Sequence, residues 1–263
     1  MIETIKNAWK IPDLRKKLLY VVFALVVFRF GYAIYVPYVD TKQLAEVFKQ
    51  YSDTLLGYFN TLSGGGFSTA SIFALSVYPY INSSIIMQLL QIAIPALERM
   101  VKDGGEEGRK KLASITRYVT IALGLLMGWT YYIMLRSSQV LTRTDAWSAV
   151  VIILTFAAGS AFVMWLGEQI NSKGVGNGIS IILFASIVSR GPSAVMGMIN
   201  GLISGSMNVL SVIVVLVVAL AMIAFIVFIT NAERRIPIQY AKRVVGRKMY
   251  GGQSTHLPMK VNM

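Results

Sequence analysis

The sequence has no cysteine and only one histidine. The absence of cysteine excludes disulfide bonds, thiolate metal sites and cysteine nucleophiles. A single histidine excludes a poly-histidine metal centre and leaves little for acid–base catalysis, and His256 has no evident nucleophile partner. We therefore expect a protein that is not an enzyme and that uses no cofactor and no metal.

Charge is scarce as well. Charged residues make up 14 % of the chain, against about 25 % in a typical soluble domain. Hydrophobic residues reach 55 %, and the mean hydropathy is +0.61. Long uncharged runs of this kind are typical of membrane proteins with several spans. The sequence therefore predicts an all-α integral membrane protein, a polytopic helical bundle.

The apolar runs define six expected spans of roughly 20 residues each. The first run could be a signal peptide, but it is long and no small-residue cleavage site follows it, so we interpret it as a retained helix. The fifth run, 179–189, is short, and a second, less apolar run at 196–207 extends it. The expected spans are residues 18–39, 72–96, 118–135, 146–167, 179–189 with 196–207, and 209–230.

The uncharged stretch 54–97 is too long for a single crossing. Its 44 residues would make a helix of about 66 Å, about twice the thickness of the hydrocarbon core. Its early part, around residues 63–66, is rich in glycine and serine and is poor helix-forming material. Two interpretations follow: a re-entrant segment enclosed by protein or water, or a glycine-rich surface loop on the outer side.

Lysine and arginine are distributed unevenly over the expected loops. Nineteen of the 25 lie in the N-terminal arm, the second-to-third loop, the fourth-to-fifth loop and the tail; five lie on the alternate side, and Arg29 lies within the first span. The positive-inside rule then places both the N-terminus and the tail in the cytoplasm. The expected domains are a cytoplasmic arm (1–17), spans one to five (18–189), an outer loop with the sixth span (190–230) and a basic cytoplasmic segment (231–263).

Polar side chains inside the expected spans are candidate functional groups. Arg29 lies near the middle of the first span, where a guanidinium must face protein or water, or reach the interface. Two interpretations of Arg29 follow: a functional group, or a member of a structural ion pair. Asn82, Ser83 and Gln88 lie in the second span, where amides and hydroxyls line water or bond neighbouring helices.

The tail carries spaced pairs of basic residues. Such pairs suit a phosphate-rich or acidic partner, and attraction to anionic lipid beside the membrane explains them equally well. The residues concerned are Lys242, Arg243, Arg247 and Lys248.

Two pairs of branched apolar residues share a four-residue spacing. Val77 and Ile81 belong to the second span, and Ile179 and Leu183 to the fifth. This spacing places each pair on one helix face. By spacing alone, ordinary packing or contact with lipid accounts for them.

Several longer strings resemble the bacterial SecY family, the channel subunit of the Sec protein translocon. They include Val-Phe-Arg-Phe-Gly at 27–31 and Ser-Gly-Gly-Gly at 63–66. The most specific are Gly-Asn-Gly-Ile-Ser-Ile-Ile at 176–182, Gln-Tyr-Ala-Lys-Arg at 239–243 and Gln-Ser-Thr-His-Leu-Pro-Met-Lys-Val-Asn at 253–262. The resemblance covers essentially the whole chain.

The resemblance implies a SecY-like fold and site residues. SecY-like proteins have ten helices in two pseudo-symmetric halves around an hourglass pore, and this chain resembles the first six helices with a re-entrant plug at about 59–70. The implied sites are a pore ring (Val77, Ile81, Ile179, Leu183), the plug (Gly64, Gly65, Gly66, Phe67, Ser68), a lateral gate (Asn82, Gln88) and ribosome or SecA contacts (Lys242, Arg243, Arg247, Lys248).

The function implied is passage of unfolded preproteins across the bacterial plasma membrane and of membrane proteins sideways into it. The implied partners are SecE and SecG subunits, the SecA ATPase, the ribosome (its rRNA and the proteins near the exit tunnel), the translocating polypeptide or signal sequence, and membrane lipids. The family continues with four more helices, so this portion is not expected to close a pore alone. The rival hypotheses are half of a solute transporter and a non-conducting truncated or assembly-intermediate form.

Overall fold

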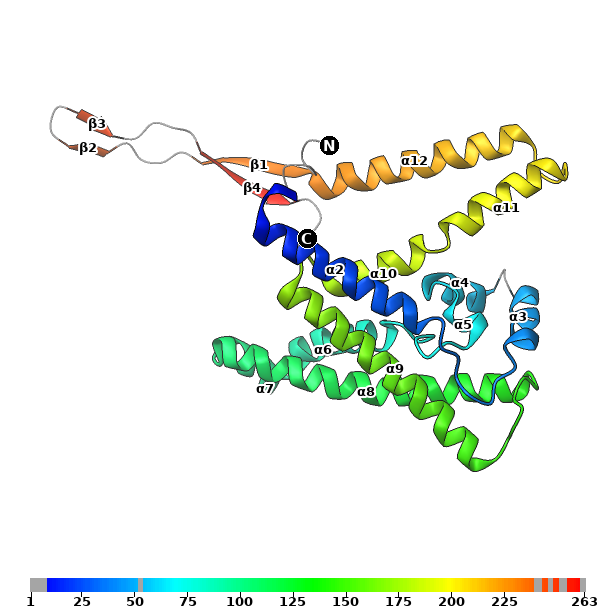
Figure 1. Cartoon of the computed structure of the whole chain (residues 1–263). Helices are drawn as coiled ribbons and strands as arrows, with labels where there is room; N and C mark the ends of the chain where they lie inside the picture. Colours follow the sequence, from blue (N-terminus) through cyan, green and yellow to red (C-terminus); the bar gives the residue numbers. More distant parts are fainter. Residues whose placement is uncertain (1–8, 52–53, 239–242, 246–247, 251–254, 261–263) are drawn as a thin grey trace. The chain divides into compact units, whose positions relative to one another are not determined.

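The computed structural model describes residues 9–51, 54–238, 243–245, 248–250 and 255–260, and these are mostly helical (Figure 1). The chain divides into two compact units, residues 1–192 and 193–263. The first unit contains α2 (Pro12–Gly31), α3 (Thr41–Gln50), α4 (Leu55–Leu62), α5 (Gly66–Thr69), α6 (Tyr78–Ala93), α7 (Pro95–Lys102), α8 (Gly105–Ser137), α9 (Ala146–Lys173) and α10 (Gly178–Val188). Beyond it lie α11 (Gly191–Ile203), which begins at the boundary, and α12 (Val209–Asn231).

Four helical stretches among the described residues are long and apolar enough to cross a membrane, and a bent helix pair makes a fifth candidate. The four are α8, α9, Gly178–Ile203 and α12, and the pair is α6 with α7. The last four expected spans each correspond to one of these stretches, so the helices predicted there are confirmed. The chain is a multi-pass membrane protein.

The first two expected spans have different bounds in the structure. The helix expected over 18–39 is α2, which begins at Pro12 and ends at Gly31, and residues 32–39 are not helical. Its first turns carry Arg15, Lys16 and Lys17. Because these charges leave too short an apolar stretch, α2 does not pass the same test of length and composition.

The second expected span, 72–96, is helical only from Tyr78 and breaks at Ile94. The residue before a proline is disfavoured in the helical region, and Ile94, which precedes Pro95, is extended at φ −109° and ψ 108°. As a result α7 leaves α6 at an angle of 98°.

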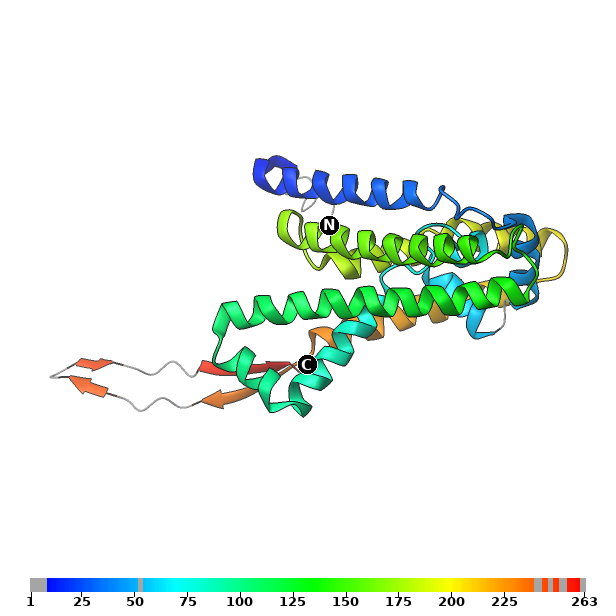
Figure 2. The same ribbon diagram turned by 90° about the horizontal axis from the view of Figure 1, so that it is seen from below.

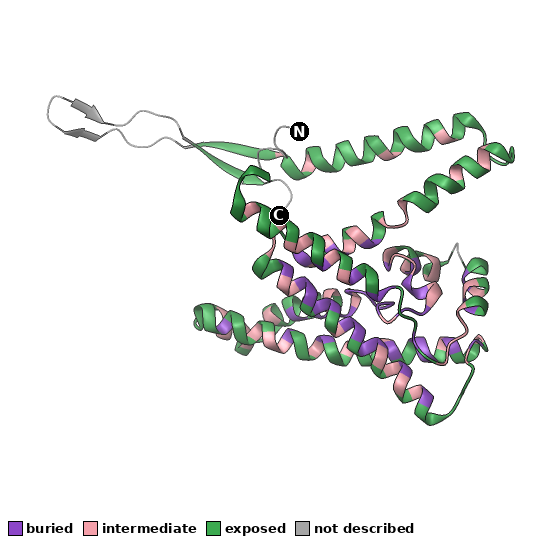
Figure 3. Cartoon of the chain, viewed as in Figure 1, coloured by how far each residue is buried: buried purple, intermediate pink, exposed green. Residues whose placement is uncertain are grey.

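Small residues allow α8 and α9, which run in opposite directions (Figure 2), to pack closely where they meet. A Cβ at Gly128 would lie 3.1 Å from the carbonyl oxygen of Ile153, and one at Gly124 would lie 2.9 Å from the hydroxyl of Ser160. Glycine and serine are common where membrane helices approach each other closely. Buried residues accordingly gather on α9 and on the segments packed against it (Figure 3).

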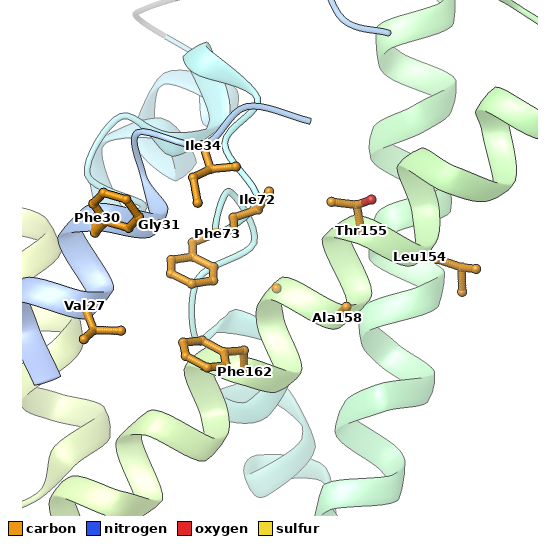
Figure 4. Close-up of a pocket in the computed structure, with 11 residues that line it drawn as sticks. Val27, Phe30, Gly31, Ile34, Ile72, Phe73, Leu154, Thr155, Ala158 and Phe162 are labelled. Atoms are coloured by element: carbon orange, nitrogen blue, oxygen red, sulfur yellow. The ribbon is translucent and has the colours of Figure 1, made fainter. Parts of the chain in front are cut away.

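Residues 71–77 connect the glycine-rich region to α6 and lie in the core. Phe73 stacks on Phe28 of α2, with ring centroids 6.0 Å apart, and on Phe162 of α9, at 5.6 Å. A hollow of about 700 Å³ opens beside Phe73 between α2 and α9, and its lining is apolar except for Thr155 (Figure 4). The aromatic stack therefore links α2 to α9 through this non-helical segment.

The tail contains strands, which the sequence analysis did not predict. β1 (Glu233–Ile238) pairs antiparallel with β4 (Thr255–Lys260), and β2 (Arg243–Val245) pairs antiparallel with β3 (Lys248–Tyr250). Isoleucine and valine along these strands suit extended backbone. The expected all-α membrane fold is confirmed, and the tail adds these two short antiparallel sheets to it.

Candidate functional site

The four residues of the expected pore ring lie in one apolar cluster. Val77 is fully buried in it, while Ile81, Ile179 and Leu183 are half-buried and pack against it. They come from α10 and from the start of α6, which are separated by about 100 residues of sequence. The fold thus brings together two pairs that the sequence relates only by spacing.

Val77 lies just before its helix and not inside it, which corrects the expectation that Val77 and Ile81 share one helix. Val77 is the N-cap of α6, with φ −90° and ψ 4°. Its carbonyl still accepts a hydrogen bond from the Ile81 amide at 3.0 Å. The two side chains therefore remain one turn apart.

The position of α10 follows from the Gly-Asn-Gly string before it. Asn177 caps the helix, its Oδ1 accepting from the amides of Ile179 and Ser180 at 3.1 and 3.3 Å. Gly178 packs so closely on α9 that a Cβ there would lie 2.1 Å from the carbonyl oxygen of Gly167. Cap and contact together fix the first turn of α10, which carries Ile179.

The glycine-rich segment is enclosed by protein, which favours the first of its two interpretations. Ser63, Gly66 and Phe67 are buried, whereas Gly64, Gly65 and Ser68 are intermediate. Gly64 and Gly65 adopt φ of 67° and 93°, a region that glycine enters at low cost.

The same segment packs directly on α10 and α2. A Cβ at Gly64 would lie 2.9 Å from the carbonyl oxygen of Ser186, and one at Gly66 would lie 2.7 Å from the ring of Tyr32. The side chain of Arg190 approaches Gly65. Glycine is required here because backbone must approach backbone and ring.

The structure gives Arg29 neighbours that the sequence could not name. Its Nη1 donates to the hydroxyl of Ser189 at 3.5 Å, and its guanidinium lies 5.8 Å from the centroid of the Tyr32 ring. Arg29 itself is exposed on α2. Its described contacts are therefore a hydroxyl and an aromatic face.

The polar residues of α6 divide into two groups. Ser83 is buried and donates to the carbonyl oxygen of Thr116 on α8 at 2.7 Å, as expected for a bond between neighbouring helices. Asn82 and Gln88, the expected lateral-gate residues, are exposed.

The basic residues of the tail are only partly described. Lys242 and Arg247 lie outside the described residues. Arg243 begins β2 opposite Tyr250, and Lys248 begins β3 opposite Val245. Within the described part of the chain, no cluster of histidine, aspartate and glutamate could hold a metal ion.

One residue at this site was missed by the sequence analysis. Tyr131 of α8 is buried, and its hydroxyl donates to the carbonyl oxygen of Phe67 in α5. Its ring lies edge-on between Phe67, at 4.9 Å, and Phe156 of α9, at 4.8 Å. The sequence marks this residue only as a tyrosine within an apolar run. Tyrosines at the membrane interface look the same in a sequence, so this feature does not identify a buried hydrogen bond.

These features define a membrane protein with the fold of protein-conducting channels. Two solved structures support this: one described as the structure of a protein conducting channel (TM-score 0.63, 18 % identity, 94 % of this chain and 52 % of that one), and a SecY structure whose plug domain is described as stabilising the closed state (TM-score 0.64, 19 % identity, with the same coverage).

Sequence comparison then identifies the family. The SecY family profile matches residues 71–263. The protein translocase subunits SecY of Thermotoga maritima and Escherichia coli K12 are 41 % and 43 % identical over 100 % and 95 % of this chain. That of Buchnera aphidicola subsp. Acyrthosiphon kondoi is 44 % identical over 95 % of it. The chain belongs to the SecY family.

The chain is shorter than these relatives. It spans 62 % of the Thermotoga protein, 57 % of the Escherichia protein and 71 % of the Buchnera protein.

Proposed function

We propose that this chain provides the N-terminal portion, with the first six helices, of a protein-conducting channel in the bacterial plasma membrane. In this role it passes unfolded preproteins across the membrane and releases membrane proteins sideways into it. The observation that carries the proposal is that Val77, Ile81, Ile179 and Leu183 belong to one apolar cluster, and that a glycine-rich segment packs on α10 and on Tyr32 of the same cluster.

The chemistry of this cluster suits a seal. An apolar constriction is hard to wet, and such constrictions gate by dewetting. Branched side chains close around a moving polypeptide without binding it. Gly64 to Ser68 act as the plug that covers the constriction when the channel is idle, and Asn82 and Gln88 line the lateral exit on α6.

The orientation follows from charge. The N-terminal arm and residues 231–263 lie in the cytoplasm, because they carry most of the lysine and arginine. With this orientation α2 is the first span and α12 the sixth. SecE and SecG subunits complete the membrane complex.

The proposal is tested by crosslinking within the full-length protein. A photoreactive residue at 81 or 183 should crosslink to a polypeptide stalled in the channel. A matched probe at Phe228, which is 74 % exposed on α12, should label lipid. Lipid-only labelling at 81 and 183 would reject the channel.

The tail is the proposed docking surface for the ribosome and the SecA motor. Arg243→Glu with Arg247→Glu should weaken cosedimentation with either partner while membrane insertion is retained, because phosphate-rich or acidic partners are attracted by basic charge. The effect should shrink as salt is raised. Unchanged cosedimentation at both low and high salt would reject this role.

A further inference from the structure

The glycine-rich segment is attached to the rest of the fold differently at its two ends. At its C-terminal end the links are backbone hydrogen bonds: the Val36 amide donates to the Ala70 carbonyl at 2.9 Å, and the Ile72 amide donates to the Ile34 carbonyl at 3.0 Å. These bonds form a short antiparallel bridge with the residues that follow α2. This end is tied by main chain on both sides of Ser71.

The hydrogen bonds of the N-terminal end are mostly internal to the segment. The amide of Ser68 donates to Asn60 Oδ1 at 2.9 Å, and the amide of Phe67 donates to the hydroxyl of Ser63 at 3.3 Å. Such bonds would travel with the segment if it moved. They stabilise its shape without holding it in place.

The bond from Tyr131 is of another kind, because it joins α5 to α8. The hydroxyl donates to the Phe67 carbonyl, and the ring packs edge-on against Phe67. A hollow of about 290 Å³ lies beside this contact, lined by residues including Leu56, Phe59 and Met127. Packing around α5 is therefore incomplete on this side, where the Tyr131 bond joins the segment to α8. On its other sides the segment packs on α3 and α10 without a hydrogen bond of this kind among the described residues.

Ala70 separates the two ends. It is fully buried and holds φ 45° and ψ 47°, a left-handed conformation that is costly for a residue with a Cβ. A change of conformation at Ala70 would relieve this cost and redirect the chain before it. The Ala70 carbonyl and the Ile72 amide, which form the bridge, follow the torsions that change and would stay paired. The bond from the Ser71 amide to the Gly66 carbonyl at 3.1 Å, in contrast, would be lost.

We propose that Tyr131 is the positioning residue that holds the plug closed, and that the plug opens about Ala70 while residues 71 and 72 stay bridged. The proposal rests on the proposed function, since a plug has meaning only in a channel. In this proposal, the hydrogen bond from the Tyr131 hydroxyl favours the docked form of α4 and α5 over a displaced form.

The test compares Tyr131→Phe with Tyr132→Phe in the full-length protein, assembled with its partner subunits in vesicles. Tyr132 is the adjacent residue and is also buried, but its ring pairs with Trp129. Because the chain has no cysteine, a single thiol can be introduced by Ser68→Cys or by Ser71→Cys, and its modification by a maleimide can be followed.

Loss of one buried hydrogen bond should raise the population of the displaced plug, and with it the modification rate of the thiol at position 68, roughly 2- to 12-fold. Tyr131→Phe should also increase ion leak through idle channels. Modification of the thiol at position 71 should stay unchanged, and Tyr132→Phe should match the parent protein. Equal modification rates at position 68 for Tyr131→Phe and the parent, or an equal rise at positions 68 and 71, would overturn the proposal.

A plug-deleted background separates positioning from general packing. With residues 60–69 replaced by two glycines, Tyr131→Phe should add no further leak. An added leak of the same size would show that Tyr131 acts through the helices themselves. If the parent protein moves no polypeptide, the proposed function fails; if it does and the modification rate at position 68 is unaffected, this inference alone fails.

Discussion

The helices α9 and α12 are both apolar, but they use that property differently. The most apolar stretch of α9 has a mean hydropathy of 2.3 and is 44 % buried, whereas that of α12 has a mean hydropathy of 3.5 and is 0 % buried. Within its own unit, the more apolar helix is thus the less packed. Hydropathy reports compatibility with lipid, whereas packing depends on side-chain shape.

Small residues explain the difference. Gly159 and Gly167 of α9 let other segments approach its backbone, and Ser160 packs on α8. Between Val209 and Asn231, α12 contains no glycine and many branched residues. In lipid the hydrophobic effect does not drive helices together, and close packing takes its place. We therefore expect substitutions in α9 to be costly and matched ones in α12 to be mild.

The largest contrast should come from two phenylalanines. Phe156→Ala should lower the free energy of unfolding by about 3 kcal/mol, at the low end of the range for soluble cores, because a cavity remains between α8 and α9. Phe228→Ala should change it little, since Phe228 is 74 % exposed. Denaturation in mild detergent measures both, and equal losses would contradict the comparison.

A smaller contrast should follow from adding one methyl group. A Cβ at Gly159 would lie 1.8 Å from the carbonyl oxygen of Ile72, whereas one at Gly197 of α11 would meet nothing within 4 Å. Gly159→Ala should therefore cost about 2 kcal/mol through overpacking. Gly197→Ala should be neutral or stabilising, because alanine favours helix. Thermal unfolding measures the stability of both variants. A neutral Gly159→Ala would contradict the expected overpacking, because it would show that residues 71–77 shift to accommodate the added methyl group.

The smallest effect should come from the ion pair that joins α8 and α9. Arg117 Nε donates to Glu168 Oε1 at 2.8 Å, with side chains 48 % and 25 % exposed. Glu168→Gln should cost about 0.5 kcal/mol, and less at high salt, because a partly exposed pair is screened. Glu107→Gln serves as the control, since its partner Lys111 lies on the same helix. A loss independent of salt would count against an electrostatic cause.

Spans were predicted best where an apolar run is continuous and sharply bounded. The apolar run 209–230 corresponds to α12 almost residue for residue. The expected span 118–135 is extended to Gly105 in α8, because Glu106–Lys110 and Glu107–Lys111 pairs at 3.0 Å stabilise the turns outside the apolar run. A search for apolar runs does not detect polar helix extensions of this kind.

Contacts between distant segments were not predictable from the residues alone. The ring residues were expected from the family resemblance, and their spacing could not show that α6 and α10 meet. The bond from Tyr131 to Phe67 and the contact of Arg29 with Ser189 join residues 64 and 160 positions apart. Nothing local in the sequence encodes such pairs, because they depend on how the helices pack.

The base of the tail has a consequence for how this region can evolve. Glu233, two residues after α12, pairs with Lys260, so the polypeptide returns to the point where it departed. The β1–β4 ladder therefore closes on the end of α12, and the length of chain between its two strands is independent of this anchorage. Insertions or deletions between the two strands would leave this first rung, and with it the end of α12, unchanged.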